Sequence, residues 1–259
     1  MTKPKSDYAI QTVQNALRLL EMFQDEIELG VSELSRRLDL HKNNVFRLLA
    51  TLELEGYIEQ SASTDRYRLG TRCLELGRAF ARGSRLLERA RPVLESLARE
   101  LGESAHLGVM HDFEVIHLDG EQPRALVLAA SRVGRRLPVH CTALGKVLVA
   151  HADAPTRVAF DERCIAAGLA SSTPATITDR DKLVEELRAV ASQGFALDLG
   201  EYDEGLACAA APVFQEGGRC VGALSVSGPS NRLTEMRLHD VAVPELVAAA
   251  ERLSHQLGA

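Results

Sequence analysis

Residues 31–69 follow the order of two amphipathic helices, a tight turn and a two-stranded hairpin. The first helix is expected to begin at Ser32, a residue type that caps helices, because Leu34 and Leu38 then recur on one face. Asp39 begins the turn. This order of elements is that of a winged helix-turn-helix, so the first part of the chain is constrained to a small helical domain with a two-stranded wing.

The second helix is expected over residues 42–55, with one apolar face turned inward and Gly56 as its C-terminal cap. In a helix-turn-helix the first turns of this helix face base edges in the major groove, where Asn suits adenine and Arg or Lys suits guanine or phosphate. The candidate DNA-binding residues of the two helices are Ser32, Lys42, Asn43, Asn44, Phe46 and Arg47.

The hairpin is expected to pair residues 57–59 with residues 67–69. Arg66 and Arg68 then lie on the wing, where they can contact a phosphate backbone or the minor groove. A small three-helix core with charges that are only solvated is the alternative, because three-helix folds are common and only the order of elements separates them.

The overall charge is negative, with 30 Lys and Arg residues against 36 Asp and Glu residues. Residues 1–70 carry nine basic and eleven acidic side chains, so any attraction to DNA must come from a local basic face. We therefore expect strongly salt-dependent binding to double-stranded DNA, with weak non-specific affinity.

The length of 259 residues predicts two domains, and 46% hydrophobic content with 25% charge is a globular composition. We expect a DNA-binding domain over residues 1–70, a helical linker over 71–84 and a second domain over 85–259. The sequence has neither an apolar leader nor an apolar run of about 18 residues, which predicts a cytoplasmic protein without a membrane span. Five cysteines without a C-x-x-C pair predict reduced thiols rather than disulfides or a zinc ribbon.

Apolar residues recur between the two domains, first over residues 74–80 and again over residues 86–101. Their spacing predicts a helical linker and a second helix, and Pro92 either kinks that helix or makes it begin anew. The apolar face of a linker helix must be covered, either by the second domain or by a partner subunit. Dimerisation is favoured, because helix-turn-helix dimers read half-sites about one DNA turn apart.

The remaining sequence alternates strands with helices. Strands are expected over residues 104–110, 114–119, 125–130, 195–198, 208–214 and 221–227, and helices over residues 142–152, 179–193 and 233–257. The fold class is therefore α+β, with a mixed α/β second domain built on a largely antiparallel sheet. Sheets covered by a helix on one face often form small-molecule sensor domains of the GAF or PAS type, although a fold does not fix a function.

Several short motifs lie in a fixed order along the chain, over residues 47–52, 55–57, 67–70, 137–146, 194–214 and 223–229. The run at residues 137–146 reads Leu-Pro-Val-His-Cys-Thr-Ala-Leu-Gly-Lys, and the last motif reads Ala-Leu-Ser-Val-Ser-Gly-Pro. Together these motifs resemble the IclR family of bacterial transcription regulators, and the resemblance spans nearly the whole chain.

The resemblance implies a repressor or activator, dimeric or a dimer of dimers, whose C-terminal domain binds a small metabolite and thereby changes binding to a palindromic operator. It implies no catalysis, and we expect no cofactor and no metal. By position, the effector pocket of the family corresponds to Leu126, Ala129, Ala143, Leu144, Asp198, Cys208, Ser225 and Ser227. Asn43 and Asn44 stand where the family commonly has Ser and Thr, so the operator sequence of other members does not transfer.

The chemistry of these positions suits a small organic acid that is keto, hydroxylated or aromatic. Residues 142–144 begin a helix whose free N–H groups suit a carboxylate. Ser225 and Ser227 place both hydroxyls on one strand face, Asp198 can accept from a ligand hydroxyl, and Cys208 gives a small wall. The same residues can instead be structural, with serines bonded to backbone, an inert buried cysteine and an aspartate that caps a turn.

Two alternative functions follow from other residues. One is a cysteine-dependent enzyme fused to a DNA-binding module, with Cys141 or Cys208 as nucleophile and His140 or His106 as base. Neighbouring side chains on an extended segment point to opposite faces, which disfavours the pair His140 and Cys141. The other is a DNA-binding protein that senses no ligand, for which a second domain of this size has no evident role. The histidines lack the helical spacing of a metal site.

Overall fold

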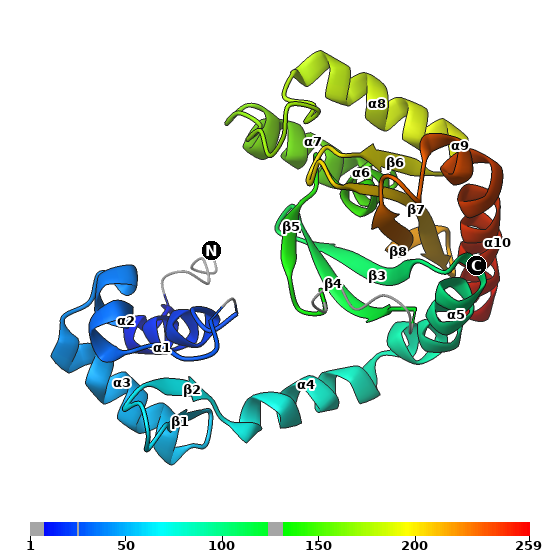
Figure 1. Cartoon of the computed structure of the whole chain (residues 1–259). Coiled ribbons are helices and arrows are strands. Elements are labelled where there is room, and N and C mark those ends of the chain that lie inside the picture. Colours follow the sequence, from blue (N-terminus) through cyan, green and yellow to red (C-terminus); the bar gives the residue numbers. More distant parts are fainter. Residues whose placement is uncertain (1–7, 25, 124–131) are drawn as a thin grey trace. The chain divides into compact units, whose positions relative to one another are not determined.

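The structure, a computed structural model, describes residues 8–24, 26–123 and 132–259 (Figure 1). The chain divides into two compact units, Met1–Gly83 and Ser84–Ala259. The winged module and the expected linker helix fall in the first unit. Within the described ranges, no helix is long and apolar enough to cross a membrane.

The first unit contains a helical core, a two-stranded wing and a further helix. Its elements are α1 Gln11–Glu21, α2 Val31–Leu38, α3 Lys42–Leu54, β1 Ile58–Gln60, β2 Tyr67–Leu69 and α4 Thr71–Gly83. Apolar residues of α1, α2, α3 and both wing strands pack together, with Leu34, Leu49 and Tyr67 at most 3% exposed. This arrangement confirms the predicted winged helix-turn-helix.

Two local predictions for this unit are wrong. Gly30 is the N-cap of α2, and Ser32 lies exposed inside the first turn without capping it. The first wing strand is Ile58–Gln60, one residue later than predicted. The reason is that the Tyr57 N–H still bonds to the Leu52 carbonyl oxygen (2.9 Å) at the end of α3, so Tyr57 belongs to the helix terminus.

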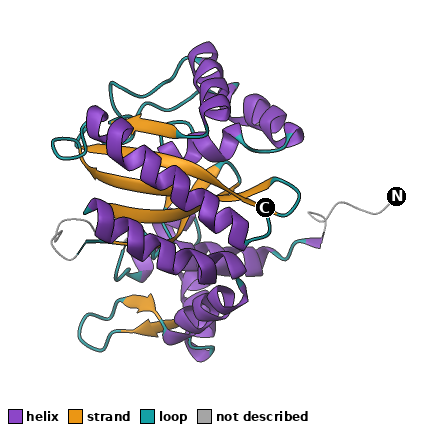
Figure 2. Ribbon diagram, turned by 90° about the vertical axis from the view of Figure 1, so that its right-hand side faces the viewer, coloured by secondary structure: helices purple, strands orange, loops and turns teal. Residues whose placement is uncertain are grey.

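The second unit is built on an antiparallel six-stranded sheet with the order β5-β4-β3-β8-β7-β6 and helices on both faces (Figure 2). Its elements are α5 Arg85–Leu101, β3 Ser104–His111, β4 Glu114–Glu121, β5 Arg136–Pro138, α6 Ala143–Ala150, α7 Ala154–Phe160, the π-helix η2 Asp161–Ile165, α8 Arg180–Gln193, β6 Ala196–Leu199, β7 Leu206–Gln215, β8 Arg219–Pro229, α9 Glu235–Arg237, the π-helix η3 Leu238–Ala242 and α10 Val243–Gln256. The predicted α+β class with an antiparallel sheet is confirmed.

Small residues of the central strands allow helices to pack closely on both faces of the sheet. On β7, Ala207, Ala209 and Ala211 belong to the core shared with α5 and α10. The alternate residues Cys208 and Ala210 belong to a second core shared with α6 and α8. The strand therefore separates the core shared with α5 and α10 from the layer that contains α6, as the two-residue period of a strand requires.

Three predictions for the second unit need correction or completion. Helix α5 continues through Pro92, which lies on its exposed side. The closing helix predicted over residues 233–257 is divided, because Pro244 has no N–H to donate and is accommodated at the start of α10, after α9 and a π-helical turn. The strand predicted over residues 125–130 lies outside the described residues. The short elements α7 and β5 were not predicted, because the spacing of their apolar residues did not indicate them.

Gly145 lies where α6 crosses the preceding segment of the chain. An added Cβ at this position would lie 2.3 Å from the Cα and carbonyl oxygen of Val139. Gly145→Ala must therefore push two backbone segments apart, and we expect a loss of about 3 kcal/mol in the free energy of unfolding, at the upper end of overpacking costs. Urea unfolding followed by circular dichroism measures this loss.

Gly77→Ala is the matched control, because nothing lies within 4 Å of an added Cβ on α4. Ala favours a helix over Gly by about 0.5–1 kcal/mol, so this variant should be as stable as the wild-type protein or slightly more stable. A Gly145→Ala protein with wild-type stability would show that α6 can move away from Val139 freely.

Candidate functional site

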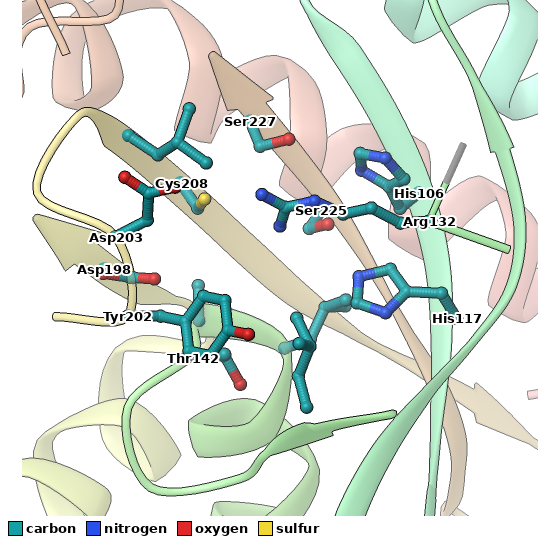
Figure 3. Close-up of a pocket in the computed structure, with 14 residues that line it drawn as sticks. His106, His117, Arg132, Thr142, Asp198, Tyr202, Asp203, Cys208, Ser225 and Ser227 are labelled. Carbon is teal, nitrogen blue, oxygen red and sulfur yellow. The ribbon is translucent and has the colours of Figure 1, made fainter. Parts of the chain in front are cut away.

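A pocket lies on the α6 face of the sheet, between the start of α6, the strands and the loop that joins β6 to β7 (Figure 3). The centre of a water-sized sphere has about 20 Å³ available inside it, within about 410 Å³ of space between atoms that includes open solvent. The residues that line it are His106, His117, Arg132, Leu137, Thr142, Ala143, Leu144, Asp198, Tyr202, Asp203, Leu206, Cys208, Ser225 and Ser227.

The predicted effector-binding residues that the structure describes all line this pocket, namely Ala143, Leu144, Asp198, Cys208, Ser225 and Ser227. Strand register explains part of this convergence. Asp198 pairs with Cys208, and Cys208 pairs with Ser227, so the three residues form one row across β6, β7 and β8. Leu126 and Ala129 lie outside the described residues. The role of these residues in binding an effector stays a prediction.

Helix α6 starts at the pocket with free N–H groups. Thr142 is its N-cap, and its Oγ1 accepts from the Gly145 N–H (3.2 Å) and donates to the Pro138 carbonyl oxygen (2.8 Å). In the described part of the chain, the N–H groups of Ala143 and Leu144 have no hydrogen-bond acceptor. Free N–H groups at the positive end of a helix favour an anion.

The hydroxyls of Ser225 and Ser227 add polar groups from another side of the pocket. Both residues lie on one face of β8 and are 4% and 7% exposed. Neither hydroxyl bonds to any residue that the structure describes, so the alternative in which neighbouring backbone satisfies them does not hold. Among the described residues, the pocket therefore presents donors without acceptors from both α6 and β8.

Asp198 combines a structural bond with a position in the pocket wall. Its Oδ1 accepts from the Glu201 N–H (2.7 Å), so it caps the turn after β6 as the structural alternative expected. The residue is 4% exposed, and burial raises the pKa of its carboxyl group to about 6. The carboxyl group therefore changes charge close to neutral pH.

A buried ion-pair network lies behind this turn. Lys146 of α6 is 1% exposed, and its Nζ donates to Glu201 Oε1 (2.5 Å) and to Glu186 Oε1 of α8 (2.9 Å). Burial alone would lower the pKa of Lys146, but the two carboxylates outweigh burial and raise that pKa. Lys146 is therefore charged and connects α6, α8 and the loop that carries Asp198.

Several polar residues of the pocket were missed by sequence reasoning, among them His106, His117, Arg132 and Tyr202. His106 pairs with Ser225 across β3 and β8, so only the strand register places it beside a predicted residue. Tyr202 lies in the turn that Asp198 caps, and this closeness in sequence was a signal that could have indicated it.

Cys141 and Cys208, the two candidate nucleophiles, are buried thiols. Burial raises the pKa of the Cys141 thiol to about 11 and also raises the pKa of Cys208. The Sγ of Cys141 contacts Ser172 Oγ at 3.9 Å, while His140 Nε2 is bonded to the Ala170 carbonyl oxygen (2.8 Å). A reactive cysteine needs a thiolate at neutral pH, which these surroundings disfavour.

Helix α3 carries the polar surface predicted for DNA. Its exposed residues near the start are Lys42, Asn43, Asn44, Phe46 and Arg47. The N-cap is His41, whose side chain accepts from the Asn43 N–H (3.3 Å), a cap that sequence reasoning missed. Asn43 and Arg47 are four residues apart and therefore share one side of the helix. Contacts of these residues with DNA stay a prediction.

The wing arginines already have anionic partners. Arg66 Nη2 donates to Glu33 Oε2 (2.9 Å) and to the Glu28 carbonyl oxygen (2.9 Å). Arg68 Nε donates to Glu59 Oε1 (2.5 Å). These pairs are partly exposed, and such pairs contribute about 0–1 kcal/mol, so a phosphate can replace the glutamate. The wing is nevertheless not a free positive patch.

A winged helix-turn-helix with a polar second helix, followed by an α+β domain with a polar pocket, defines a DNA-binding transcription regulator with an additional C-terminal domain. Known domain families agree with this class. Residues 12–62 match the IclR helix-turn-helix domain, and residues 79–255 match the bacterial transcriptional regulator IclR C-terminal domain. The chain belongs to the IclR family, which confirms the resemblance seen in its sequence.

Individual relatives cover almost the whole chain. The HTH-type transcriptional regulator XynR of Escherichia coli (strain K12) is 34% identical over 250 residues, which cover 96% of this chain and 98% of XynR. The crystal structure of an IclR transcriptional regulator from Alicyclobacillus acidocaldarius matches with a TM-score of 0.86 at 28% identity, covering 97% of this chain and 100% of that one. An IclR homologue from Microbacterium hydrocarbonoxydans was crystallised in complex with 4-hydroxybenzoate. It matches with a TM-score of 0.80 at 28% identity, and the match covers 95% of this chain and 98% of the homologue.

Asp198→Asn tests the electrostatics of the pocket, because the amide oxygen can still accept from the Glu201 N–H. The pKa of Asp198 is raised from 3.8 to about 6, so the wild-type carboxyl group loses its contribution to stability as the pH rises from about 4 through 6. We expect equal stability of the two proteins at pH 4, and a variant more stable by about 1–3 kcal/mol at pH 8. Urea unfolding across this pH range measures the difference.

Asp203→Asn is the control for this experiment. Asp203 is exposed and accepts a similar hydrogen bond from the Gly205 N–H (3.0 Å), so its substitution makes the same change from carboxylate to amide outside the buried surroundings of Asp198. A difference between wild type and Asp198→Asn that does not vary with pH would contradict the raised pKa.

Proposed function

We propose that the chain regulates transcription in the cytoplasm, and that a small organic acid bound in the pocket changes its affinity for a palindromic operator. The observation that carries the proposal is the set of donors around the pocket, at the start of α6 and on β8, that have no hydrogen-bond acceptor among the residues that the structure describes. Buried donors without partners are costly, so a bound acceptor is their natural complement.

An anion is the ligand that one side of the pocket favours, opposite the carboxyl groups of Asp198 and Asp203 that also line it. The guanidinium of Arg132 points into the pocket in Figure 3 and has no ion-pair partner among the residues described here. Together with the free N–H groups of α6, it offers a carboxylate charge-assisted hydrogen bonds. The Microbacterium relative that binds 4-hydroxybenzoate, itself a small carboxylic acid, supports this ligand class.

A homodimer or a dimer of dimers is proposed as the DNA-binding form. Apolar side chains of the first unit are more than half exposed on α1 (Val13 and Leu17) and on α4 (Leu76 and Phe80). Packing against a second copy of the chain would cover such residues. Two copies would also bring two α3 helices to paired half-sites on DNA.

The enzyme alternative is disfavoured by the buried, protonated thiols of Cys141 and Cys208. The alternative of a DNA-binding protein that senses no ligand is also disfavoured, because it does not explain the pocket's polar groups that have no partner among the described residues. We therefore propose a regulator that is not an enzyme.

Arg47→Ala tests the DNA-binding surface. Arg47 is exposed on α3 and shares one side of the helix with Asn43, so we expect it to contact a base edge or a phosphate. Its loss should weaken operator binding by about 1–3 kcal/mol. Fluorescence anisotropy on an operator selected from random DNA measures the affinity, and the same titration gives the number of chains bound per operator.

Arg99→Ala removes an equally exposed arginine from α5 of the second unit and should leave operator affinity unchanged. Wild-type affinity of the Arg47→Ala protein would place the recognition surface elsewhere on the first unit.

Ligand coupling is tested in two stages. A thermal-shift screen of small organic acids first identifies a binder, because a ligand at about 100 times its Kd stabilises the folded state by about 2.7 kcal/mol. Operator affinity is then measured with and without the saturating acid. We expect a change of about 5–150-fold, which corresponds to a coupling of about 1–3 kcal/mol.

Ser225→Ala is the variant that connects the pocket to this response. It should weaken binding of the acid while operator affinity without the acid stays at the wild-type value, because Ser225 lies in the second unit. Equal operator affinity with and without saturating acid would contradict the proposed function.

A further inference from the structure

Two histidines outside the predicted site line the pocket from neighbouring strands (Figure 3). His106 lies on β3 and His117 on β4, and they are 4% and 3% exposed. Their rings meet edge to face, with centroids 5.4 Å apart and planes at 89°. An added Cβ at Gly120 would lie 2.8 Å from the His106 ring, so this ring has little room to turn. The pair is therefore a rigid part of the pocket wall.

Both rings are neutral at pH 7. Burial is the main cause that lowers the pKa of His106 to about 3 and the pKa of His117 to about 4; the positive charge of Arg132 contributes to both shifts, and His117 contributes to that of His106. A neutral imidazole has one N–H and one lone pair, so it can donate one hydrogen bond and accept another. This wall is polar without charge, and the nearby guanidinium disfavours a ligand ammonium group.

The Nδ1 atom of His117 is buried and has no hydrogen-bond partner among the residues that the structure describes. Leaving a buried group of this kind unpaired costs free energy. Figure 3 shows the His117 ring at the wall of the pocket, next to the space that a bound molecule would fill.

We propose that His117 makes the pocket selective for a hydroxylated carboxylic acid, by a hydrogen bond between its Nδ1 and the ligand hydroxyl. The carboxylate of the same ligand binds the N–H groups at the start of α6, on a different element of the pocket. A hydroxyl suits either tautomer of the ring, because it both donates and accepts. This inference rests on the proposed function, and it specifies a hydroxyl as the second polar group of the effector beside its carboxylate.

Isothermal titration calorimetry of the full chain tests the inference with acids that differ by one hydroxyl: lactate and propionate, malate and succinate, 4-hydroxybenzoate and benzoate. For a pair that binds wild-type protein, we expect the hydroxylated member to bind at least about tenfold more tightly. His117→Phe keeps a ring next to His106 but removes both nitrogens. In this variant the two members should bind within about threefold of each other, with the affinity for the unhydroxylated acid retained.

Tyr202→Phe is the matched control, because it removes a different polar group from the same pocket. The preference for the hydroxylated acid should persist in this variant. Its loss in Tyr202→Phe and persistence in His117→Phe would assign the selection to Tyr202 and overturn the inference.

The remaining outcomes separate the inference from the proposed function. A preference that survives in His117→Phe, or equal binding of both members to wild type, overturns the inference alone. If no acid of any pair binds the wild-type protein, the proposed function fails and the inference fails with it. If His117→Phe does not fold, ¹⁵N NMR of histidine-labelled wild type decides: the Nδ1 resonance of His117 should shift with the hydroxylated acid only, and an equal shift with both acids overturns the inference.

Discussion

The ammonium group of Lys146 is the charge around which the pocket is organised. It is 1% exposed and is held between Glu186 of α8 and Glu201 of the loop after β6. Moving such charges out of water is expensive, and only close pairing offsets the cost, so the three elements are held in one arrangement. The backbone of Glu201 in turn bonds to Asp198. The position of a pocket residue therefore depends on an ion pair that lies behind it.

The pocket concentrates polar groups whose hydrogen-bonding capacity the protein itself does not use. Examples from two strands are the Nδ1 atom of His117 and the hydroxyls of Ser225 and Ser227, none of which has a hydrogen-bond partner among the residues that the structure describes. Elsewhere in the unit the other face of the same sheet is covered by apolar residues such as Ala209 and Leu224. Folded proteins satisfy most of their buried polar groups, and local exceptions are typical of functional sites. The well-packed apolar face provides the stability that allows this exception.

Patterns of neighbouring residues in the sequence predicted many of the helices and strands. Contacts between residues far apart in the sequence could not be predicted in this way. The spacing of Leu34 and Leu38 was enough to predict α2, and the two-residue period of β8 placed Ser225 and Ser227 on one face. The position of His106 could not be predicted, because it depends on which strand lies beside β8. The partner of Arg66 was equally hidden, since Arg66 binds a carboxylate more than thirty residues away in the sequence.

The carboxylate partners of the wing arginines affect how such a protein would search a chromosome. When a phosphate replaces Glu33 beside Arg66, the glutamate must return to water, so each exchange yields little net attraction. Contacts of this kind form equally well on any sequence, and their weakness shortens each stay on random DNA. A regulator with a wing of this type would sample many sites briefly, and its residence time would be set by the base contacts of α3.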